Sequence, residues 1–436
     1  MLGDFAFALD RYQLAVDSRQ RRTANWEPGT EQMTRRERLM ATLRGEPVDR
    51  PAVNFYEIGG FDVDPSNPDE FNVYNDPSWR PLLELAEERT DLIRMRSAVR
   101  SRSWDPQTAN PGGQKTEDGG QRTPCRVGSQ PTREGDVVRI HYVEEQWHCT
   151  RVTIGIGGRA LSSTTRRNPA VDTVWTTEHL LKNTEDLRAY LELPEEFFAE
   201  EIDVARLVEE DRKVGDRGIV MVDTEDPICA AASLFSMEDY LTVALTEPVL
   251  FHQLLDKLSR PLYARTEHVS EAFPGHLWRV YGPEYAAEPF LPPRLFKEYV
   301  VRYTEPMVRA IKKHGGFARV HCHGRIAAIL DSICEMGADA TDPIEPPPQG
   351  DVGLDYVRRK YGERLVLFGN IELSDIELME PVPFEQRVKQ TLADGTRGQG
   401  RGFILMPSSA PNGRQITPRT LKNYETLVRL AESFSL

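Results

Sequence analysis

The chain has 436 residues, 39% hydrophobic and 28% charged, a balance typical of a globular protein rather than a disordered one. Its formal net charge of -14 argues against nucleic acid and anionic membrane surfaces as partners, because both attract basic faces. The five cysteines are scattered without a CxxC pair and predict no disulfide framework. No apolar run approaches the ~18 residues of a membrane-spanning helix, and the first segment does not resemble a signal peptide, so we expect a cytoplasmic protein.

The first 33 residues are interpreted as an N-terminal extension, rich in Arg and Gln and broken at Pro28-Gly29. The first clearly predicted helix follows this extension. Thr34 and Glu37 have the spacing of a capping box and predict the start of a helix, which Gly45 should end. A short buried strand over 51–57 is expected next.

An irregular insertion is expected around 104–165. Its first part, DPQTANPGGQKTEDGGQRTP, is rich in Gly, Pro and Thr and predicts a long surface segment. The later stretches VVRIHYVEE and WHCTRVTIG carry β-branched and aromatic residues and predict a hairpin. We interpret residues 34–436 as a single domain that contains this insertion.

From residue 180 onward, amphipathic helices alternate with short apolar strands, and this order implies parallel pairing through crossover helices. Gly315, Gly337 and Gly395 stand where these helices are expected to end. With the strand over 51–57 and another near 90–95, the predicted strands are 219–225, 277–284, 317–323, 338–345, 365–370 and 403–409. Eight strands in this order predict a (β/α)₈ TIM barrel with an N-terminal extension and an inserted hairpin region.

Reactive side chains follow the predicted strands at their carboxyl ends. In a (β/α)₈ barrel the active site lies at this rim, because the βα loops converge there. A single polar residue at a strand end is also explained as an ordinary loop residue, so the argument depends on their number. The side chains in question are Glu57, Asp223 or Glu225, Glu284, His321 with His323, Asp342 or Glu345, Asn370, and Ser408 with Ser409.

His321 and His323 form the most specific pattern. Residues i and i+2 of an extended segment point to the same side, so both imidazoles can reach one point, while Cys322 is expected to point away. Two such imidazoles suit a divalent transition metal, with Zn²⁺ as the first candidate and carboxylates completing the shell. Two alternatives stay open: the histidines contact the substrate or act as acid and base, or they serve the structure alone.

Three further residues are candidates for catalysis. Glu284 is a possible third metal ligand or general base, or else it caps the next helix. Glu345 lies in a proline-stiffened loop that suits a positioned carboxylate, with a salt bridge to Arg325 as the structural alternative. Asn370 follows Gly369 at a strand end, where its side chain acts in catalysis or holds the loop.

Several separated motifs resemble one known family. The stretch from Arg38 to Pro51, RLMATLRGEPVDRP, is similar to the opening signature of the uroporphyrinogen decarboxylase superfamily. Three later motifs are similar to the C-terminal half of that superfamily: His321-Cys322-His323-Gly324, Gly337-Ala338-Asp339 and Gly369-Asn370-Ile371. The similarity runs from about residue 34 to the end. It implies a (β/α)₈ barrel and suggests a homodimer.

The resemblance also separates two chemistries. True decarboxylases of the superfamily bind substrate carboxylates with an RQAGR-like segment, where this chain reads FYEIGGF (55–61), without arginine and with an acid. A tetrapyrrole with eight carboxylates would be repelled there. The zinc-dependent, cobamide-linked methyltransferases hold their metal on a His-x-Cys-Gly motif and a later Cys. This chain keeps His321 and Gly324, but has His323 in place of the first Cys and Ser408-Ser409 near the second.

These comparisons lead to a working hypothesis. A shell of nitrogen and oxygen ligands, His321 and His323 with Glu284, would favour an oxygen substrate over a thiol. We expect metal-dependent methyl transfer from a small O-methyl type substrate to a corrinoid (cobalamin). Because the chain has no DxHxxG motif, the corrinoid would be carried on a separate protein. The alternatives are a cofactor-free decarboxylase or lyase of a small carboxylic acid, and a non-catalytic paralogue that binds a tetrapyrrole or corrinoid.

Overall fold

The computed structural model describes residues 32–102, 132–135, 137–398 and 402–435. Nearly all of the predicted N-terminal extension, and the Gly- and Pro-rich first part of the predicted insertion, lie outside these residues. Eight parallel strands form the central sheet, in the order β1-β15-β14-β13-β12-β11-β10-β2. Their bounds are β1 (Ala52–Val53), β2 (Leu92–Arg96), β10 (Gly218–Glu225), β11 (Leu277–Tyr281), β12 (Phe317–His321), β13 (Ala340–Asp342), β14 (Val366–Ile371) and β15 (Phe403–Pro407).

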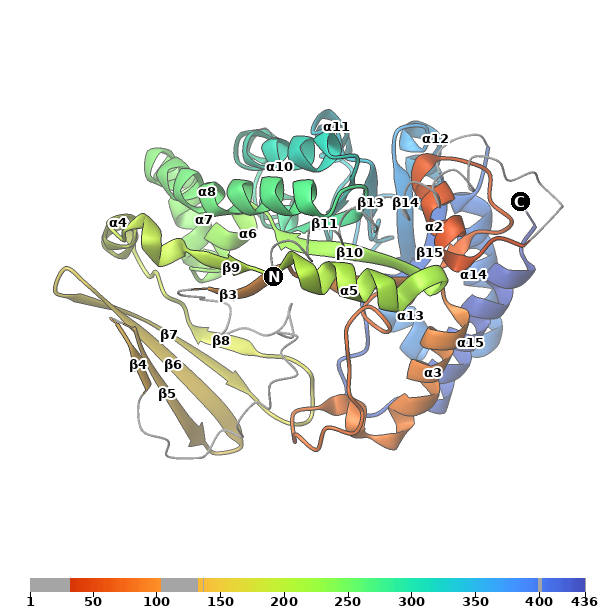
Figure 1. Ribbon diagram of the computed structural model, residues 1–436, viewed down its shortest axis with the longest axis horizontal. Coiled ribbons are helices and arrows are strands. Elements are labelled where there is room, and N and C mark those ends of the chain that lie inside the picture. Colours follow the sequence, from red (N-terminus) through yellow and green to blue (C-terminus); the bar gives the residue numbers. More distant parts are fainter. Residues whose placement is uncertain (1–31, 103–131, 136, 399–401, 436) are drawn as a thin grey trace, which may run out of the picture.

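Each of these strands lies where the sequence predicts one, and the sheet curls with helices packed around it (Figure 1). The predicted (β/α)₈ barrel is confirmed. Its seam lies between β1 and β2, where the Asp91 amide donates to the Val53 carbonyl oxygen (2.7 Å) and the Asn54 amide Nδ2 donates to the Asp91 carbonyl oxygen (3.0 Å). These links join the two end strands of the sheet.

The helices of the barrel follow its strands as the alternation requires. The α-helices are α2 (Arg35–Arg44), α3 (Arg80–Arg89), α4 (Thr184–Leu191), α5 (Val204–Val214), α6 (Pro227–Ala232), α7 (Met237–Thr246), α8 (Pro248–Ala272), α9 (Pro293–Phe296), α10 (Arg302–Lys313), α11 (Leu330–Glu335), α12 (Leu354–Tyr361), α13 (Leu373–Leu378), α14 (Pro381–Gly395) and α15 (Pro418–Ser433). A π-helical turn, η7 (Lys297–Val301), joins α9 to α10, and short 3₁₀ turns are η1 (Val73–Asn75), η2 (Pro77–Trp79), η4 (Glu195–Phe198), η5 (Gly215–Arg217) and η6 (Pro283–Ala286). In the described part of the chain, no helix combines the length and the apolar character that crossing a membrane requires.

The predicted helix ends are mostly confirmed. Thr34 and Glu37 form the capping box at the start of α2, and Gly45 ends it with φ 72°. Gly315 and Gly337 also have positive φ, as a left-handed cap requires. The prediction for Gly395 is wrong, because this residue is still helical and lies against the Phe403 ring, where a Cβ atom would meet ring carbon at 2.6 Å. Close packing, rather than a cap, explains glycine there.

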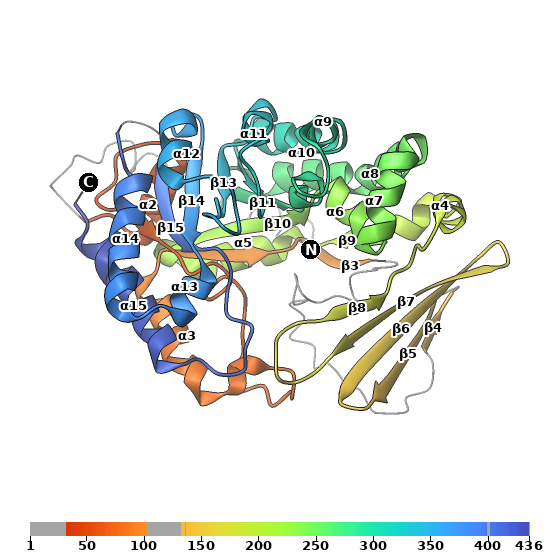
Figure 2. The ribbon, with the colours of Figure 1, turned by 180° about the vertical axis from the view of Figure 1, so that it is seen from behind.

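The predicted hairpin is present as β5 (Val137–Glu144) and β6 (Trp147–Ile156), paired antiparallel. It belongs to a larger antiparallel sheet with β4 (Thr132–Glu134), β7 (Arg159–Arg167) and β8 (Trp175–Glu178). Two further strands, β3 (Val99–Arg102) and β9 (Glu200–Ile202), pair with each other. Figures 1 and 2 both show the five-stranded sheet at one side of the barrel, outside its helices.

The sheet and the barrel share one core. Buried Val152, Ile154 and Leu161 of the sheet belong to the same apolar cluster as Leu187 and Tyr190 of α4, and as residues of α8, α14 and α15. A separate cluster contains buried side chains of the barrel strands, among them Met95, Met221, Phe368 and Met406, together with Tyr56. The strands that lead to the barrel mouth are therefore packed on buried apolar side chains.

Candidate active site at the barrel mouth

The structure brings His321 and His323 together, as their spacing predicts. His321 is the last residue of β12 and is buried, while His323 lies in the loop beyond it with its side chain 36% exposed. Their ring centroids are 4.6 Å apart and the ring planes are nearly perpendicular. The two imidazoles therefore share one side of the chain at the carboxyl end of the strand.

His321 is held in one tautomer by a buried carboxylate. Its Nδ1 atom lies 2.7 Å from Oδ2 of Asp342, the last residue of β13. Burial lowers the pKa of His321 to about 3, and although burial opposes it, the cations around Asp342, Arg319 first, hold the pKa of that carboxyl at about 2. The neutral imidazole thus donates its Nδ1 proton to Asp342, and its Nε2 lone pair is left for another partner.

His323 has a carboxylate partner of its own. Its Nδ1 atom lies 2.8 Å from Oε1 of Glu345, and the Gly324 amide donates to the other oxygen at 2.6 Å. Burial opposes both charges, but the hydrogen bond between them raises the pKa of His323 and lowers that of Glu345. Glu345 is therefore the positioned carboxylate that the sequence suggests, and its partners are His323 and Gly324 rather than Arg325.

Glu284 lies in the η6 turn that follows β11. Its Oε2 atom is buried and has no hydrogen-bond partner among the described residues. Burial raises the pKa of Glu284, with the nearby charge of His323 opposing the shift. A buried carboxylate oxygen without a donor, close enough to His323 to feel its charge, is the kind of atom that a cation or a proton would satisfy.

Asn370 holds a loop in this structure. Its side-chain amide Nδ2 donates to the carbonyl oxygen of Ile344, 3.1 Å away, in the loop that carries Glu345. Ile344 has a positive φ of 56°, which is unusual for a β-branched residue and needs such support. The contact assigns Asn370 a positioning part for Glu345, and its predicted part in catalysis stays a prediction.

A charged network inside the barrel was not predicted from the sequence. Arg279 of β11 pairs with Asp223 of β10 through two contacts of 2.6 and 2.9 Å, and its third nitrogen donates to the hydroxyl of Tyr56. That hydroxyl lies 3.4 Å from Nε2 of His321. Arg319 of β12 lies 2.9 Å from Asp342. An unbroken chain of polar contacts thus runs from Asp223 to the first histidine.

The sequence did contain a signal for this network. Arg279 and Arg319 each stand in the middle of an otherwise apolar strand, LWRVY and FARVH, and the two residues are register partners in the sheet. A buried cation needs a carboxylate, so two arginines side by side in buried strands indicate acids nearby. Asp223 and Asp342 were identified as rim residues, but not as their partners.

Glu372 is a further acid at the mouth that the sequence did not single out. It directly follows β14, is 7% exposed, and accepts a hydrogen bond from the Ser408 hydroxyl at 3.2 Å. Burial, and secondarily the charge of Glu345, raises its pKa to about 7. Ser408, predicted at the rim, therefore supports a carboxyl group there.

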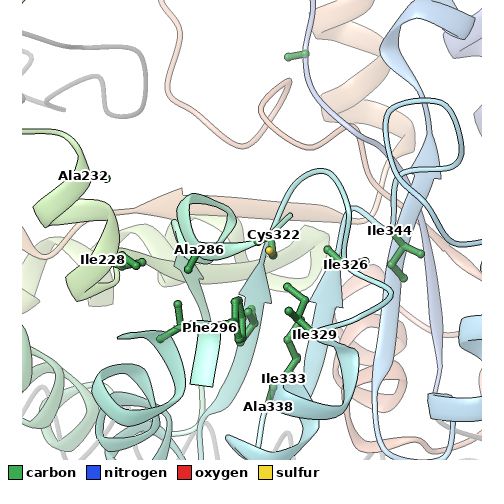
Figure 3. Packing of buried hydrophobic residues seen from close by; sticks show 14 of the residues in the cluster. Ile228, Ala232, Ala286, Phe296, Cys322, Ile326, Ile329, Ile333, Ala338 and Ile344 are labelled. Atoms are coloured by element: carbon green, nitrogen blue, oxygen red, sulfur yellow. The ribbon is translucent and has the colours of Figure 1, made fainter. Parts of the chain in front are cut away.

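Cys322 points away from the histidines, as their alternation predicts. It is buried in the main apolar cluster, where Figure 3 shows it among side chains such as Ala286 and Ile326. Burial raises the pKa of its thiol well above the ordinary value, so a thiolate is disfavoured there. Among the residues that the structure describes, the candidate donors named at this mouth are nitrogen and oxygen atoms.

The comparison with known families agrees with this architecture. A family model described as Uroporphyrinogen decarboxylase (URO-D) matches residues 161–433. The chain belongs to this family. The matched residues contain the whole series from β10 to β15, and the uroporphyrinogen decarboxylase-like barrel is completed by β1 and β2, which precede them. No curated protein sequence matches the chain.

A solved structure shows the same fold. A methyltransferase from Methanosarcina mazei aligns with a TM-score of 0.51 and 16% sequence identity, covering 92% of this chain and 99% of the other. At such identity the likeness establishes the fold alone. A protein assigned as a fructose-1,6-biphosphate aldolase from Coccidioides immitis aligns with a TM-score of only 0.22 and 10% identity, over 52% of this chain and 84% of the other, and carries no argument.

Proposed function

We propose that this chain is a methyltransferase that moves a methyl group from oxygen in a small substrate to a corrinoid carried on a separate protein. We further propose that His321, His323 and Glu284 hold a divalent metal ion, with zinc as the first candidate. The supporting observation is the pair of imidazoles whose Nδ1 atoms are both tied to carboxylates, at 2.7 and 2.8 Å. Histidine ligands of metals are commonly oriented in this way, with the second nitrogen left for the ion.

The residues fit such an ion in type. His321 is neutral at Nε2, His323 is its neighbour, and Glu284 has a buried oxygen without a hydrogen-bond partner in the described part of the chain. Among the described residues, no three His, Cys, Asp or Glu side chains are already gathered closely enough to enclose an ion. The proposed set therefore needs a further donor or a shift of Glu284.

When bound, a divalent ion would supply a Lewis acid for the substrate oxygen that loses the methyl group. The protein's own part is orientation and proton handling. Asp342 and Glu345 fix the two imidazoles, and Asn370 braces the loop of Glu345. Glu372, with a pKa of about 7, can exist in both protonation states near neutrality, which suits a group that protonates the released oxygen.

Metal analysis tests this proposal. Purified protein, incubated with Zn²⁺ and freed of excess ion, is compared with the H321A/H323A double variant and with H314A. His314 is a suitable control because it pairs with Glu267 on the far, surface side. We expect stoichiometric zinc in the wild type and in H314A, and a loss of at least tenfold in the double variant. Equal and negligible metal in all three would refute the metal site.

A metal-free lyase or decarboxylase of a small carboxylic acid is the second candidate. The observation in its favour is Arg319, whose buried Nη2 atom has no hydrogen-bond partner among the described residues and could receive a carboxylate. In that reaction the histidines would act as acid and base, and turnover would continue in the presence of chelators and without corrinoid. A screen of methyl donors with and without cob(I)alamin and chelator distinguishes the two candidates.

A further inference from the structure

Tyr56 contacts Nε2 of His321, the ring nitrogen that does not face Asp342. Its hydroxyl oxygen is 3.4 Å from His321 Nε2, and the two rings stack with centroids 5.8 Å apart. The side chain is 4% exposed. We propose that Tyr56 is a metal ligand, with its phenol oxygen joining the histidines in the proposed metal site. This inference rests on the metal-dependent function proposed above.

The distance between the two atoms supports the assignment. For a hydrogen bond from a hydroxyl, 3.4 Å is long, since such contacts usually measure about 2.5–3.0 Å between heavy atoms. For two ligands of one tetrahedral zinc ion, with bonds of about 2.0–2.1 Å, the expected separation is about 3.3 Å. The spacing of 3.4 Å thus suits a shared ion better than a direct bond.

Tyr56 also supplies what the other residues lack. Among the described residues, no three His, Cys, Asp or Glu side chains are close enough together to hold a metal ion. A tyrosine oxygen would therefore add a ligand that these four residue types do not provide. Cys322 is buried in the apolar cluster, away from the histidines. A phenol oxygen would supply an anionic ligand, its proton leaving to solvent as the ion binds.

The surroundings of Tyr56 hold its oxygen in place. Arg279 donates to that oxygen, and Asp223 fixes Arg279 from the other side with two contacts. Ligand atoms of metal sites are commonly oriented by hydrogen bonds from surrounding residues. The two buried cations nearby, Arg279 and Arg319, are paired with two anions, Asp223 and Asp342.

The backbone at Tyr56 points to the same conclusion. Tyr56 has φ 57°, in the left-handed region that a bulky residue rarely adopts, and its amide donates to Asn54 Oδ1 at 2.8 Å. Such conformations persist where surrounding structure enforces them, and they cluster at functional sites. Here the unusual turn directs the phenol into the barrel beside His321.

A spectroscopic test uses iron as the probe. The full chain is loaded anaerobically with Fe²⁺ and oxidised, because phenolate bound to Fe³⁺ gives an intense visible charge-transfer band that imidazole and carboxylate ligands do not give. We expect this band in the wild type and its loss in Y56F. The control is Y424F, which removes the hydroxyl of another fully buried tyrosine, packed on Phe55 with no hydrogen-bond partner among the described residues.

Zinc affinity provides the second measurement. Competition with a chromophoric chelator should show Zn²⁺ binding weakened about tenfold or more in Y56F, and unchanged in Y424F. Thermal unfolding of both variants verifies that each remains folded. If the wild type binds Fe³⁺ and Zn²⁺ without the band, and Y56F binds zinc equally well, Tyr56 is not a ligand while the metal site stands. If the wild type binds neither ion, the metal-dependent function itself is wrong, and this assignment falls with it.

Discussion

The orientation of His323 depends on Glu345, the side chain that receives its Nδ1 proton. Burial alone would lower the pKa of this histidine, and the hydrogen bond to Glu345 is the largest influence that raises it. In E345Q the charge of the partner is gone, so we expect the pKa of His323 to fall below its wild-type value. An NMR titration of the imidazole signals, assigned with an H323Q variant, measures the shift.

The same pair has a defined pH window. Its contribution to stability requires a charged Glu345, whose pKa lies below the ordinary 4.5, and a charged His323, whose pKa lies above the ordinary 6.5. The contribution is therefore complete between about pH 4.5 and 6.5. It is lost as pH falls through the lowered carboxyl pKa or rises through the raised imidazole pKa. Urea unfolding of wild type and E345Q should differ most inside this window, and an equal difference at pH 9 would contradict the pairing.

Sequence patterns identified the histidines but not all of their partners. The i, i+2 spacing of His321 and His323 is visible in one short stretch of the sequence, because alternation is a local property. The contact of Tyr56 with His321 joins residues that are 265 positions apart. It also depends on a left-handed backbone conformation at Tyr56, which the sequence FYEIGGF does not predict. Residues brought together by closure of the barrel are found only once the register of its strands is known.

At the scale of elements, Asp91 closes the barrel. Its carboxylate is fully buried and accepts from the Val53 amide at 2.9 Å, from Arg38 at 2.6 Å and from Arg50 at 2.9 Å. Removing the charge in D91N takes their shared anion from buried Arg38 and partly buried Arg50, so we expect a loss of about 3–5 kcal/mol in the free energy of unfolding. Urea denaturation measures it.

A matched control for that prediction is D331N. Asp331 is 63% exposed and pairs with Lys360 at 3.6 Å on the surface, so the same substitution should change stability by no more than about 0.5 kcal/mol. Similar losses in the two variants would mean that the seam does not depend on Asp91. Next to this seam, Asp49 pairs with Arg38, while Arg50 pairs with Asp91.

The eight strands were predictable because each is a short apolar run between helices with clear periodicity. The residues at which the strands begin and end were harder to predict. The strand expected over 338–345 is only Ala340–Asp342, because Pro343 has no amide hydrogen for the ladder. The stretch expected over 51–57 pairs only at Ala52–Val53 before the chain turns at Tyr56. In both places the strand ends where a residue of the mouth has to be placed.

For the whole molecule, the question is whether the antiparallel sheet and the barrel unfold together. Ile154 of β6 is fully buried in the cluster that also contains Leu187 and Tyr190 of α4. Truncation in I154A should therefore cost about 2–5 kcal/mol through lost burial and the cavity left behind. Ile140, on the neighbouring strand β5, is 37% exposed, and I140A should cost far less.

Hydrogen exchange shows how that loss is distributed. If the shared core makes the two parts one cooperative unit, I154A lowers the protection of slowly exchanging amides in β10 to β12 as much as in β5 to β7. Residues 34–436 then behave as the single domain that the sequence predicts. If protection falls in the sheet alone, the sheet is a separate unit attached to a self-sufficient barrel. The protection of β11 and β12 decides between these outcomes. It also bears on the site, because these strands and the loops after them position Glu284 and both histidines.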